Sequence, residues 1–322
     1  MADALTLDRP CQAIATLTLN PAVDIAYEVD RLVDDQKTHA RTTRYDPGGN
    51  GINVARALKE LMVCAHSCCI VAGNVGALLQ RLLQHHLDDP HCVEVEGETR
   101  INATILQAEP PVQYEVTGIG PRVSALALAA VRERFLGLCK EGFGVLTGSV
   151  PPGVDEHIYA ELLREIRAQG GFGVVDAHGT LLHTAIAEKP FIIKPNRYEL
   201  GLLCGRELTR LEDVAEESRR LQRQGVEYIC VSLGSEGALL VGPAGSFYAR
   251  APAIAVRSTV GSGDSMVAGL VAAFARRQRP EEALRLAVAC GSGTAAQPGT
   301  AIFSYNDLGA LLQQIEVTPL DI

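Results

Sequence analysis

Short apolar runs alternate with longer amphipathic segments along most of the chain, and no other sequence feature constrains the fold as strongly. The short runs predict strands over residues 13–19, 68–72, 144–147, 173–176, 191–194, 228–232 and 238–241. The amphipathic segments predict helices over residues 53–62, 77–87, 124–140, 156–168, 211–224, 265–276, 281–295 and 305–315. The alternation is regular from Gly144 onward, which predicts an α/β fold with a mostly parallel central sheet. In such folds the functional loops follow the carboxyl ends of the strands.

Two segments, 24–45 and 94–116, interrupt this alternation. They contain β-prone stretches at 25–29, 103–107 and 113–116 without intervening helical patterns. They predict either a small separate sheet over the edge of the main domain or two ordinary hairpins within one fold. No linker-like or repetitive stretch divides the chain, so we expect residues 1–322 to form one domain.

Charge and hydropathy restrict the partners and the location. The formal net charge is −9 at pH 7, which argues against binding to nucleic acid or to an anionic membrane. The apolar runs are too short to cross a bilayer, and nothing at the N-terminus resembles a signal peptide. We therefore expect a cytoplasmic protein with neither nucleic acid nor membrane as a partner.

The cysteines and histidines give little indication of a metal site. The nine cysteines include no C-x-x-C pair, and the segment 64–69, with its three cysteines and His66, runs directly into an apolar stretch. We predict buried reduced thiols there rather than metal ligands. The pair His85 and His86, and His91 beside Cys92, have no second ligand pair nearby in the sequence, so we predict surface or loop positions for them.

The segment Ser258–Ser265 is the most informative motif for chemistry. It places Gly261, Gly263 and Asp264 at the start of a predicted helix. Glycines allow close approach of the backbone, and a helix start offers unpaired N–H groups, so the turn is suited to an anion. A carboxylate beside an anion is consistent with a base that takes a proton during phosphoryl transfer, and an ordinary aspartate pKa near 4 keeps it ionised at neutral pH. The alternative is a turn followed by a capping acid.

Other candidate motifs also follow predicted strands or start helices. Asn53, after the glycine turn 47–51, is predicted either to contact a bound hydroxyl or to cap the helix. Asn196 and Glu199 are placed to face one ligand or a metal-bound water, or to form a capping box. The segment 232–237 predicts a hairpin turn or a nucleotide cradle, and the segment 147–153 an extended turn.

Several common nucleotide and catalytic motifs are absent from the sequence. The chain has no Gly-Lys dipeptide and therefore no P-loop, and it also lacks the G-x-G-x-x-G, H-E-x-x-H and G-x-S-x-G patterns. These absences exclude the P-loop route to ATP binding.

The motifs together resemble those of the PfkB/ribokinase family of carbohydrate kinases, and within it most closely the minor bacterial 6-phosphofructokinases. The resemblance is nearly full length and rests on segments 16–24, 47–56, 147–153, 194–200 and 258–269. It implies a ribokinase-like three-layer α/β sandwich with a β-sheet lid formed from about 24–45 and 94–118. It also implies ATP and Mg²⁺ as cofactors, a sugar phosphate as acceptor, and a homodimer that assembles through the lids.

The resemblance also implies a role for individual residues. Asp264 matches the catalytic base, and Lys37 matches a lysine that approaches both the sugar and the transferred phosphate. The anion hole is matched by Gly261, Ser262 and Gly263, and the sugar-phosphate site by Asp24, Gly48, Gly49, Asn53, Arg100 and Ser149. The nucleotide side is matched by Lys194, Asn196, Ser232, Gly234 and Gly237, and a metal contact through water by Glu199. The chain departs from the family pattern at Asn50, where the minor enzymes have a fourth glycine, and at His39, where they have arginine.

These observations favour a kinase for fructose 6-phosphate. Within the same enzyme class, the alternatives are a 1-phosphofructokinase, a tagatose-6-phosphate kinase, or a kinase for an unphosphorylated sugar or nucleoside. From other classes, the alternatives are a catalytically silent sugar-phosphate sensor and a nucleotide-hydrolysing switch. The intact Gly261, Gly263 and Asp264 argue against a silent binder, which does not need a base at an anion hole.

Overall fold

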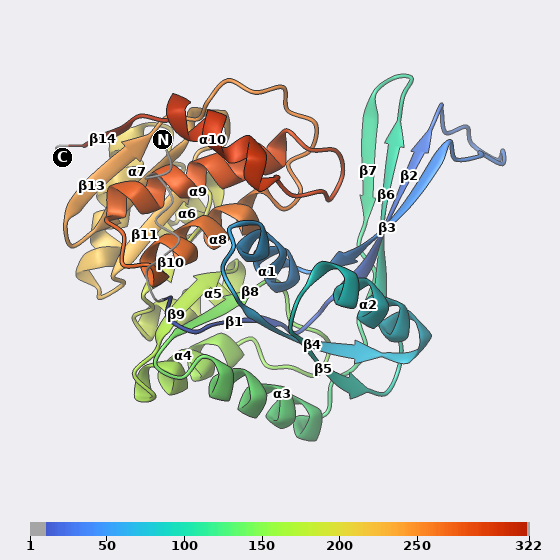
Figure 1. Ribbon diagram of the computed structural model, residues 1–322, viewed down its shortest axis with the longest axis horizontal. Helices are drawn as coiled ribbons and strands as arrows, with labels where there is room; N and C mark the ends of the chain where they lie inside the picture. The colour runs from blue at the N-terminus through green and yellow to red at the C-terminus, as the bar shows by residue number, and fades with distance from the viewer. Residues whose placement is uncertain (1–10, 321–322) are drawn as a thin grey trace.

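A ten-stranded sheet forms the centre of the computed structural model, which describes residues 11–320 (Figure 1). Across the sheet the strands run in the order β14-β13-β12-β11-β10-β9-β8-β1-β4-β5. The strands from β11 to β5 are parallel, and the remaining three are antiparallel. The bounds are β1 Ile14–Thr18, β4 His66–Ala72, β5 Pro90–Val95, β8 Phe143–Thr147, β9 Phe172–Asp176, β10 Ile192–Ile193, β11 Tyr228–Ser232, β12 Ala238–Gly242, β13 Gly245–Ala249 and β14 Val317–Pro319.

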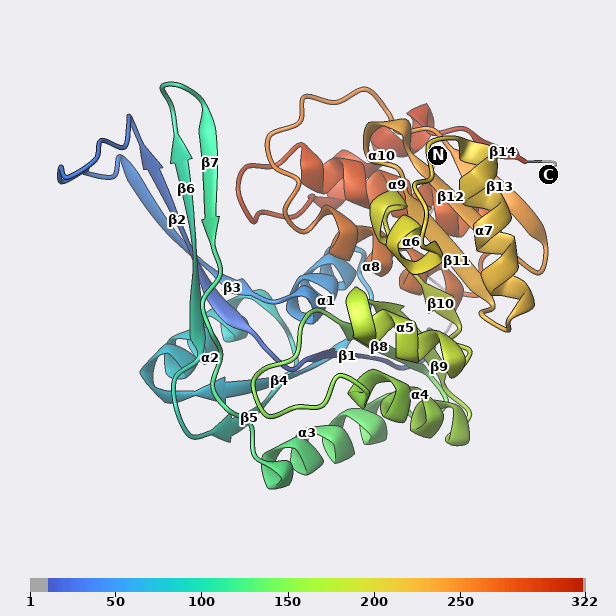
Figure 2. The ribbon, with the colours of Figure 1, turned by 180° about the vertical axis from the view of Figure 1, so that it is seen from behind.

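Helices cover both faces of this sheet (Figures 1 and 2). Alternate residues of a strand point to opposite faces, and β1 shows this clearly, because Ile14 joins one core cluster while Ala15 and Leu17 join the other. On the Ile14 face lie α1 Asn50–Glu60, α2 Gly73–His86, α8 Ser262–Ala275, α9 Pro280–Ala295 and α10 Tyr305–Gln314. On the other face lie α3 Ala125–Leu138, α4 Ile158–Ala168, α5 Gly179–Ala187, α6 Arg197–Cys204 and α7 Leu211–Arg223. The predicted α/β sandwich is confirmed.

A second, four-stranded sheet projects from the edge of this sandwich (Figure 2). Its strands, in the order β3-β2-β6-β7, are β3 Thr42–Gly48, β2 Ala22–Val29, β6 Arg100–Gln107 and β7 Val112–Val116. The outer pairs are antiparallel, and the central pair β2 and β6 is parallel. The β-prone stretches of the two segments therefore form a small separate sheet rather than two hairpins within the main one, although Glu94 and Val95 end β5 of the large sheet. We call it the small sheet.

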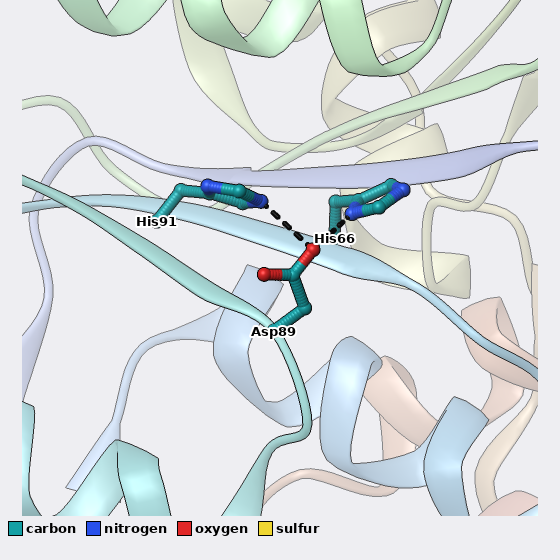
Figure 3. Close-up of side chains that lie close together, drawn as sticks. All are labelled: His66, Asp89 and His91. Carbon is teal, nitrogen blue, oxygen red and sulfur yellow. Dashed lines mark hydrogen bonds and ion pairs between the residues drawn. The ribbon is translucent and has the colours of Figure 1, made fainter.

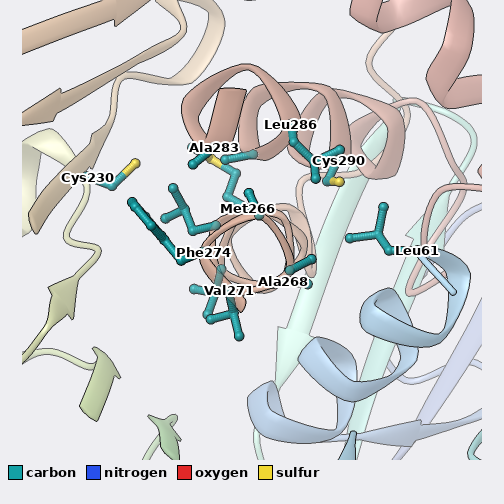
Figure 4. Packing of buried hydrophobic residues seen from close by; sticks show 14 of the residues in the cluster. Leu61, Cys230, Met266, Ala268, Val271, Phe274, Ala283, Leu286 and Cys290 are labelled. Carbon is teal, nitrogen blue, oxygen red and sulfur yellow. The ribbon is translucent and has the colours of Figure 1, made fainter. Parts of the chain in front are cut away.

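Helix α8 is almost entirely buried and carries Asp264 in its first turn. Every residue from Asp264 to Ala275 is buried. Figure 4 shows its apolar side chains between α1, α9 and the large sheet, with Phe274 on the side of Cys230. Each buried Val or Leu side chain contributes roughly 1.5–3 kcal/mol, so the position of the Asp264 turn is fixed by a large apolar contact.

Several elements differ from the sequence-based expectation. Helix α5 and strands β3, β5, β13 and β14 were not predicted, and of α6 only the start at Asn196 was anticipated. Strand β10 is two residues long where 191–194 was expected. Helices α5 and α6 are only nine and eight residues long, too short to show a clear helical period. The prediction for His91 was wrong, because it lies within β5 with its side chain 17% exposed. Cys68 and Cys69 are buried as predicted, whereas Cys64 is exposed.

The described helices contain no membrane-spanning candidate. Among residues 11–320, none is both long enough and apolar enough to cross a lipid bilayer.

Candidate active site

The first turn of α8 has the geometry of an anion site. Gly261 precedes the helix with φ of 75°, a left-handed conformation that favours glycine. Among the described residues, no backbone or side-chain acceptor receives the N–H groups of Gly263 and Asp264. The hydroxyl of Ser262 is buried and also lacks a hydrogen-bond partner. Buried polar groups without partners are rare and costly, so these donors are suited to a bound anion.

The carboxylate of Asp264 lies beside these donors and is 4% exposed. Asn50 Nδ2 donates to its Oδ1 at 2.9 Å, and Asn53 Nδ2 donates to its Oδ2 at 2.9 Å. Burial, and then the negative charge of Asp176, raise the pKa of Asp264 to about 6, although the two asparagine hydrogen bonds lower it. The expected ordinary pKa near 4 is therefore corrected, and the carboxyl remains largely ionised at neutral pH.

Asn50 was noted in the sequence only as a departure from the family pattern. The structure places it as the first residue of α1, with its side chain on the candidate base. Asn53 is not the helix cap, because Gly49 occupies that position with φ of 128°. Arg56 Nη1 donates to Asn53 Oδ1 at 3.2 Å, which orients the Asn53 amide so that its nitrogen faces Asp264.

Asp24 and Gly48 form a second polar group at the base of the small sheet. A Cβ atom at position 48 would lie 2.3 Å from Asp24 Oδ1, so only glycine allows this carboxylate to pack against the turn. Asn102 Nδ2 donates to the same oxygen at 2.8 Å. Burial raises the pKa of Asp24, whereas the Asn102 hydrogen bond lowers it. Gly49 packs equally tightly, because a Cβ atom there would lie 2.6 Å from Thr18 Cγ2.

Arg100 and Ser149 are brought together by Asn20, a residue that the sequence analysis did not single out. Arg100 donates to the Asn20 carbonyl from Nε at 3.1 Å and from Nη2 at 2.7 Å. Asn20 Nδ2 donates to Ser149 Oγ at 3.1 Å, while Asn20 Oδ1 is buried without a partner. Asn20 lies within the 16–24 motif just after β1, and its position after a central strand was the available signal.

Lys194 forms a buried ion pair with Asp176 beside the α8 turn. Lys194 Nζ lies 3.2 Å from Asp176 Oδ1, and a Cβ atom at position 263 would lie 3.2 Å from the same nitrogen. Burial raises the pKa of Asp176. Burial lowers the pKa of Lys194, but attraction to Asp176, Cys230 and Glu199 together with the Asp176 hydrogen bond raises that pKa overall. Asp176 ends β9 and was predicted only as a strand residue, although the strand end was again the signal.

The remaining nucleotide-side residues follow β10 and β11. Asn196 and Glu199 form a capping box on α6, in which Asn196 Oδ1 accepts from Glu199 N and Glu199 Oε2 accepts from Asn196 N, both at 2.8 Å. Asn196 is bridged to Ser232, which places the two loops side by side. Gly234 begins a short 3₁₀ turn within the β11–β12 hairpin, and a Cβ atom at Gly237 would lie 2.0 Å from the Ala249 carbonyl oxygen.

Lys37 does not join these groups. It is exposed and belongs to the segment 30–41 that connects β2 to β3. Figure 1 shows this segment at the free end of the small sheet, far from α8. Most of the other predicted site residues fall into two groups, one around Asp24 and Arg100 and one around Lys194 and Glu199. Asp264 accepts from Asn53 and lies near Lys194 and Asp176.

Comparison with known proteins supports the resemblance to carbohydrate kinases along almost the whole chain. Residues 17–307 match the profile of the family described as pfkB family carbohydrate kinase. The chain is 37% identical to 1-phosphofructokinase of Rhodobacter capsulatus, over 95% of this chain and 98% of that protein. It is 34% identical to 1-phosphofructokinase of Bacillus subtilis, over 95% of this chain and 100% of that protein.

Similar solved structures include several of phosphofructokinase-2 from Escherichia coli. The complex with substrates and products has a TM-score of 0.90 and 31% identity, covering 94% of this chain and 98% of the other. The complex with fructose-6-phosphate has a TM-score of 0.88, and the tetrameric inhibited form 0.87, each at 30% identity and the same coverage.

Proposed function

The chain belongs to the pfkB family of carbohydrate kinases, and we propose that it transfers the γ-phosphoryl group of ATP to the 6-hydroxyl of fructose 1-phosphate. An ATP-dependent sugar-phosphate kinase is the activity that the family and the relatives support as a whole. The choice of fructose 1-phosphate rests on the relatives named 1-phosphofructokinase, which reverses the order of our sequence-based alternatives. The observation that carries the chemistry is the pairing of the buried Asp264 carboxylate with the partnerless donors of its own helix turn.

In this proposal Asp264 is the general base. Its carboxylate accepts the proton of the acceptor hydroxyl while the hydroxyl oxygen bonds to the γ-phosphorus and the bond to the ADP oxygen breaks. A pKa of about 6 is suited to this role, because the group is ionised at neutral pH and yet more basic than an ordinary aspartate. Asn50 and Asn53 hold both carboxylate oxygens in place.

The α8 turn and Lys194 stabilise the charge that develops on the transferred group. The N–H groups of Gly263 and Asp264 and the hydroxyl of Ser262 have hydrogen-bonding capacity free for phosphate oxygens. The Lys194 ammonium lies against Gly263 and adds a positive charge at the same place. Because phosphoryl transfer depends on alignment and charge neutralisation, this arrangement can supply most of the catalysis.

The nucleotide side fits a magnesium nucleotide. Mg²⁺ binds proteins through one or two carboxylates, phosphate and water rather than in a closed protein cage, and it neutralises phosphate charge. Asp176 and Glu199 are close enough that the charge of Glu199 raises the pKa of Asp176. We propose that Glu199 contacts the ion through water, and that Asn196, Ser232, Gly234 and Gly237 contact the nucleotide.

The sugar side lies at the base of the small sheet. Arg100 offers a guanidinium that suits a phosphate, and Asp24 and Ser149 offer partners for sugar hydroxyls. Gly48 and Gly49 allow the turn to pack closely against Asp24 and Thr18, and Asn53 extends the group toward Asp264. We propose that the backbone of this turn contacts the sugar. For Lys37 to contact the transferred phosphate, the small sheet must close over the site or a second subunit must supply the lysine.

Fructose 6-phosphate is the second candidate acceptor. It was the first expectation from the sequence, and the similar E. coli phosphofructokinase-2 structure in complex with that sugar supports it. The two sugars exchange the positions of phosphate and free hydroxyl, so both require the same polar groups around Asp264. We further propose a cytoplasmic homodimer that assembles through the small sheet.

The acceptor is tested by measuring ADP release from MgATP with fructose 1-phosphate, fructose 6-phosphate, tagatose 6-phosphate, fructose and ribose. We expect the highest kcat/KM for fructose 1-phosphate. A preference for fructose 6-phosphate would restore the first expectation without changing the mechanism. No turnover with any sugar, despite ATP binding, would support the silent-sensor alternative instead.

A further inference from the structure

Two histidines and an aspartate meet at the edge of the large sheet, outside the candidate active site (Figure 3). His66 is the first residue of β4, Asp89 immediately precedes β5, and His91 lies within β5. Asp89 Oδ2 lies 2.5 Å from His66 Nδ1 and 3.0 Å from His91 Nε2. One ligand atom from each of the three residues lies within 4.8 Å of the other two.

The register of the two parallel strands explains why these residues converge. Ser67 pairs with Pro90 and Cys68 with His91, so the three side chains project from the same face of neighbouring strands. They lie at the amino ends of β4 and β5, whereas the Asp264 site lies beyond the carboxyl ends of the parallel strands. The cluster is therefore separate from the proposed catalytic chemistry.

We propose that His66, Asp89 and His91 form a binding site for Zn²⁺ or a similar borderline divalent transition metal. Two imidazole nitrogens and one carboxylate oxygen are a donor set that Zn²⁺ uses, with a fourth position open to water. Ligand atoms about 2.0–2.1 Å from a tetrahedral ion are about 3.3 Å apart. Small side-chain movements would therefore separate the hydrogen-bonded atoms of His66, Asp89 and His91 far enough to admit the ion. The side chains are partly exposed, which gives the ion a path of entry.

Arg134 is the charged neighbour that opposes this site. Its Nη1 lies 3.2 Å from His91 Nδ1, so in the metal-free protein it donates to that nitrogen and the neutral ring carries its hydrogen on Nε2, facing Asp89. Metal at Nε2 requires the hydrogen to move to Nδ1 and Arg134 to turn away. Arg134 is exposed on α3 and is free to do so, at a cost in metal affinity.

The bound ion would connect β5, the edge strand of the large sheet, to its neighbour β4. Because the unfolded chain does not hold the three ligands together, metal binding would stabilise the folded state. Without metal, the same residues form a hydrogen-bonded clamp between the strands, which is the competing interpretation. A metal site predicts that the protein binds one equivalent of metal and that Arg134 weakens this binding. A hydrogen-bonded clamp predicts neither.

The test is calorimetric titration of the full-length protein with Zn²⁺ in excess Mg²⁺, together with the visible absorption of the Co²⁺-loaded protein. We expect one equivalent bound, a tetrahedral Co²⁺ spectrum and a rise in Tm. Asp89→Asn and His91→Gln should each weaken Zn²⁺ binding at least about 10-fold. Loss of a residue that only hydrogen-bonds to a metal ligand already lowers metal affinity by about 10-fold or more, so loss of a ligand itself should cost at least as much. Arg134→Gln should tighten it, because it removes the opposing charge while offering an acceptor to Nδ1–H.

The matched control is Asp155→Asn, which breaks another exposed histidine–aspartate pair, that of His157 and Asp155. Among residues 11–320, no third histidine, cysteine or carboxylate joins this pair. The control variant should leave Zn²⁺ binding unchanged. Binding that survives Asp89→Asn and His91→Gln, or that disappears in Cys92→Ser, would overturn the proposal, because Cys92 faces Cys69 at 3.5 Å on the other side of β5. If the ligand variants fail to fold, unchanged or weaker binding by Arg134→Gln would overturn it equally.

Discussion

Burial of the Asp264 carboxyl raises its pKa to about 6, and this shift predicts a pH dependence of activity. Since the base must be deprotonated, kcat/KM should fall about tenfold for each pH unit below about 6. Asp264→Asn should lower kcat at least about 100-fold, the usual contribution of general-base catalysis, with little change in ATP affinity. Steady-state rates over pH 5 to 8 and an ATP-binding isotherm provide the measurements. A variant with near-normal kcat removes Asp264 from this role.

The stability of the same variant separates the catalytic effect from misfolding. The folded pKa of Asp264 lies above the unfolded value of about 3.9, so the folded state holds the proton more tightly between the two values. The free energy of unfolding therefore falls as pH rises through this window, by up to about 3 kcal/mol in total. Asp264→Asn lacks this penalty, and urea titrations should show it gaining stability relative to the natural protein from pH 4 to pH 7.

Asn50 is predicted to tune the base. Its hydrogen bond lowers the pKa of Asp264, so Asn50→Gly should move the acid limb of the kcat/KM profile to higher pH. Hydrogen bonds to charged groups contribute about 1.5–3 kcal/mol, which corresponds to a shift of about one to two pH units and to a loss of about 10- to 100-fold in kcat/KM below the original pKa of about 6. Asn74→Gly, at an exposed position in the first turn of α2, is the control. An unshifted profile would mean that the contact is not maintained during turnover.

The residues that the sequence missed share one physical feature. Asn20, Asn50 and Asp176 act through partners far away in the sequence, respectively Arg100, Asp264 and Lys194. Local patterns indicate glycine turns and helix starts, because these depend on neighbouring residues. They do not indicate which strand ends will meet, so Asp264 and Asn53 were singled out from their own motifs, whereas the contact of Asn50 with Asp264 was not predicted.

At the scale of elements, the close approach of α8 and α9 fixes the anion site. A Cβ atom at Gly269 would lie 2.7 Å from Ala287 Cα, so Gly269→Ala must push the two helices apart. Overpacking of this kind costs about 1–3 kcal/mol. We expect a lower free energy of unfolding and also a lower kcat, because the same helix carries Asp264 in its first turn.

Gly309→Ala is the matched control for this prediction. Gly309 lies inside α10, and a Cβ atom there would meet nothing within 4 Å. The substitution should stabilise the protein by about 0.4–1 kcal/mol and leave kcat unchanged. If denaturant titrations show both variants to be equally stable, the α8–α9 contact is not as close as the structure indicates.

The type of a helix or strand was easier to predict than the complete set of elements. Strands such as β8 and β9 are short apolar runs between turn residues, and the period of α7 is clear, so their types followed from local pattern. Strand β14 is three residues long and pairs with β13 across the chain's last helices, a contact that no local pattern encodes. The missing helical patterns in both segments left a separate small sheet and two ordinary hairpins as alternatives, because local pattern does not encode which strands pair.

At the scale of the whole molecule, one face of the small sheet is apolar, and beyond Val23 and Ile25, which pack against α2, the described residues leave much of it exposed. Strand register places Tyr45, Ile101, Tyr114 and Val116 on this face, with exposed fractions of 47%, 43%, 42% and 62%. The opposite face carries Asp24 and Asn102 and belongs to the sugar side. Clustered exposed apolar side chains are typical of an interaction surface, and a second copy of this chain is the occupant that we propose.

Tyr114→Lys should therefore dissociate the dimer, whereas Gln113→Lys, the adjacent residue on the opposite face of β7, should not. Each buried aromatic side chain contributes about 1.5–3 kcal/mol. A two-fold interface loses this twice, so the dimer dissociation constant should rise at least about 100-fold. Sedimentation equilibrium gives the constant directly. If Lys37 reaches the active site only in the dimer, kcat of Tyr114→Lys should decrease as the protein is diluted, whereas kcat of Gln113→Lys should not. An unchanged kcat in the Tyr114→Lys monomer would mean that Lys37 reaches the site by closure of its own small sheet.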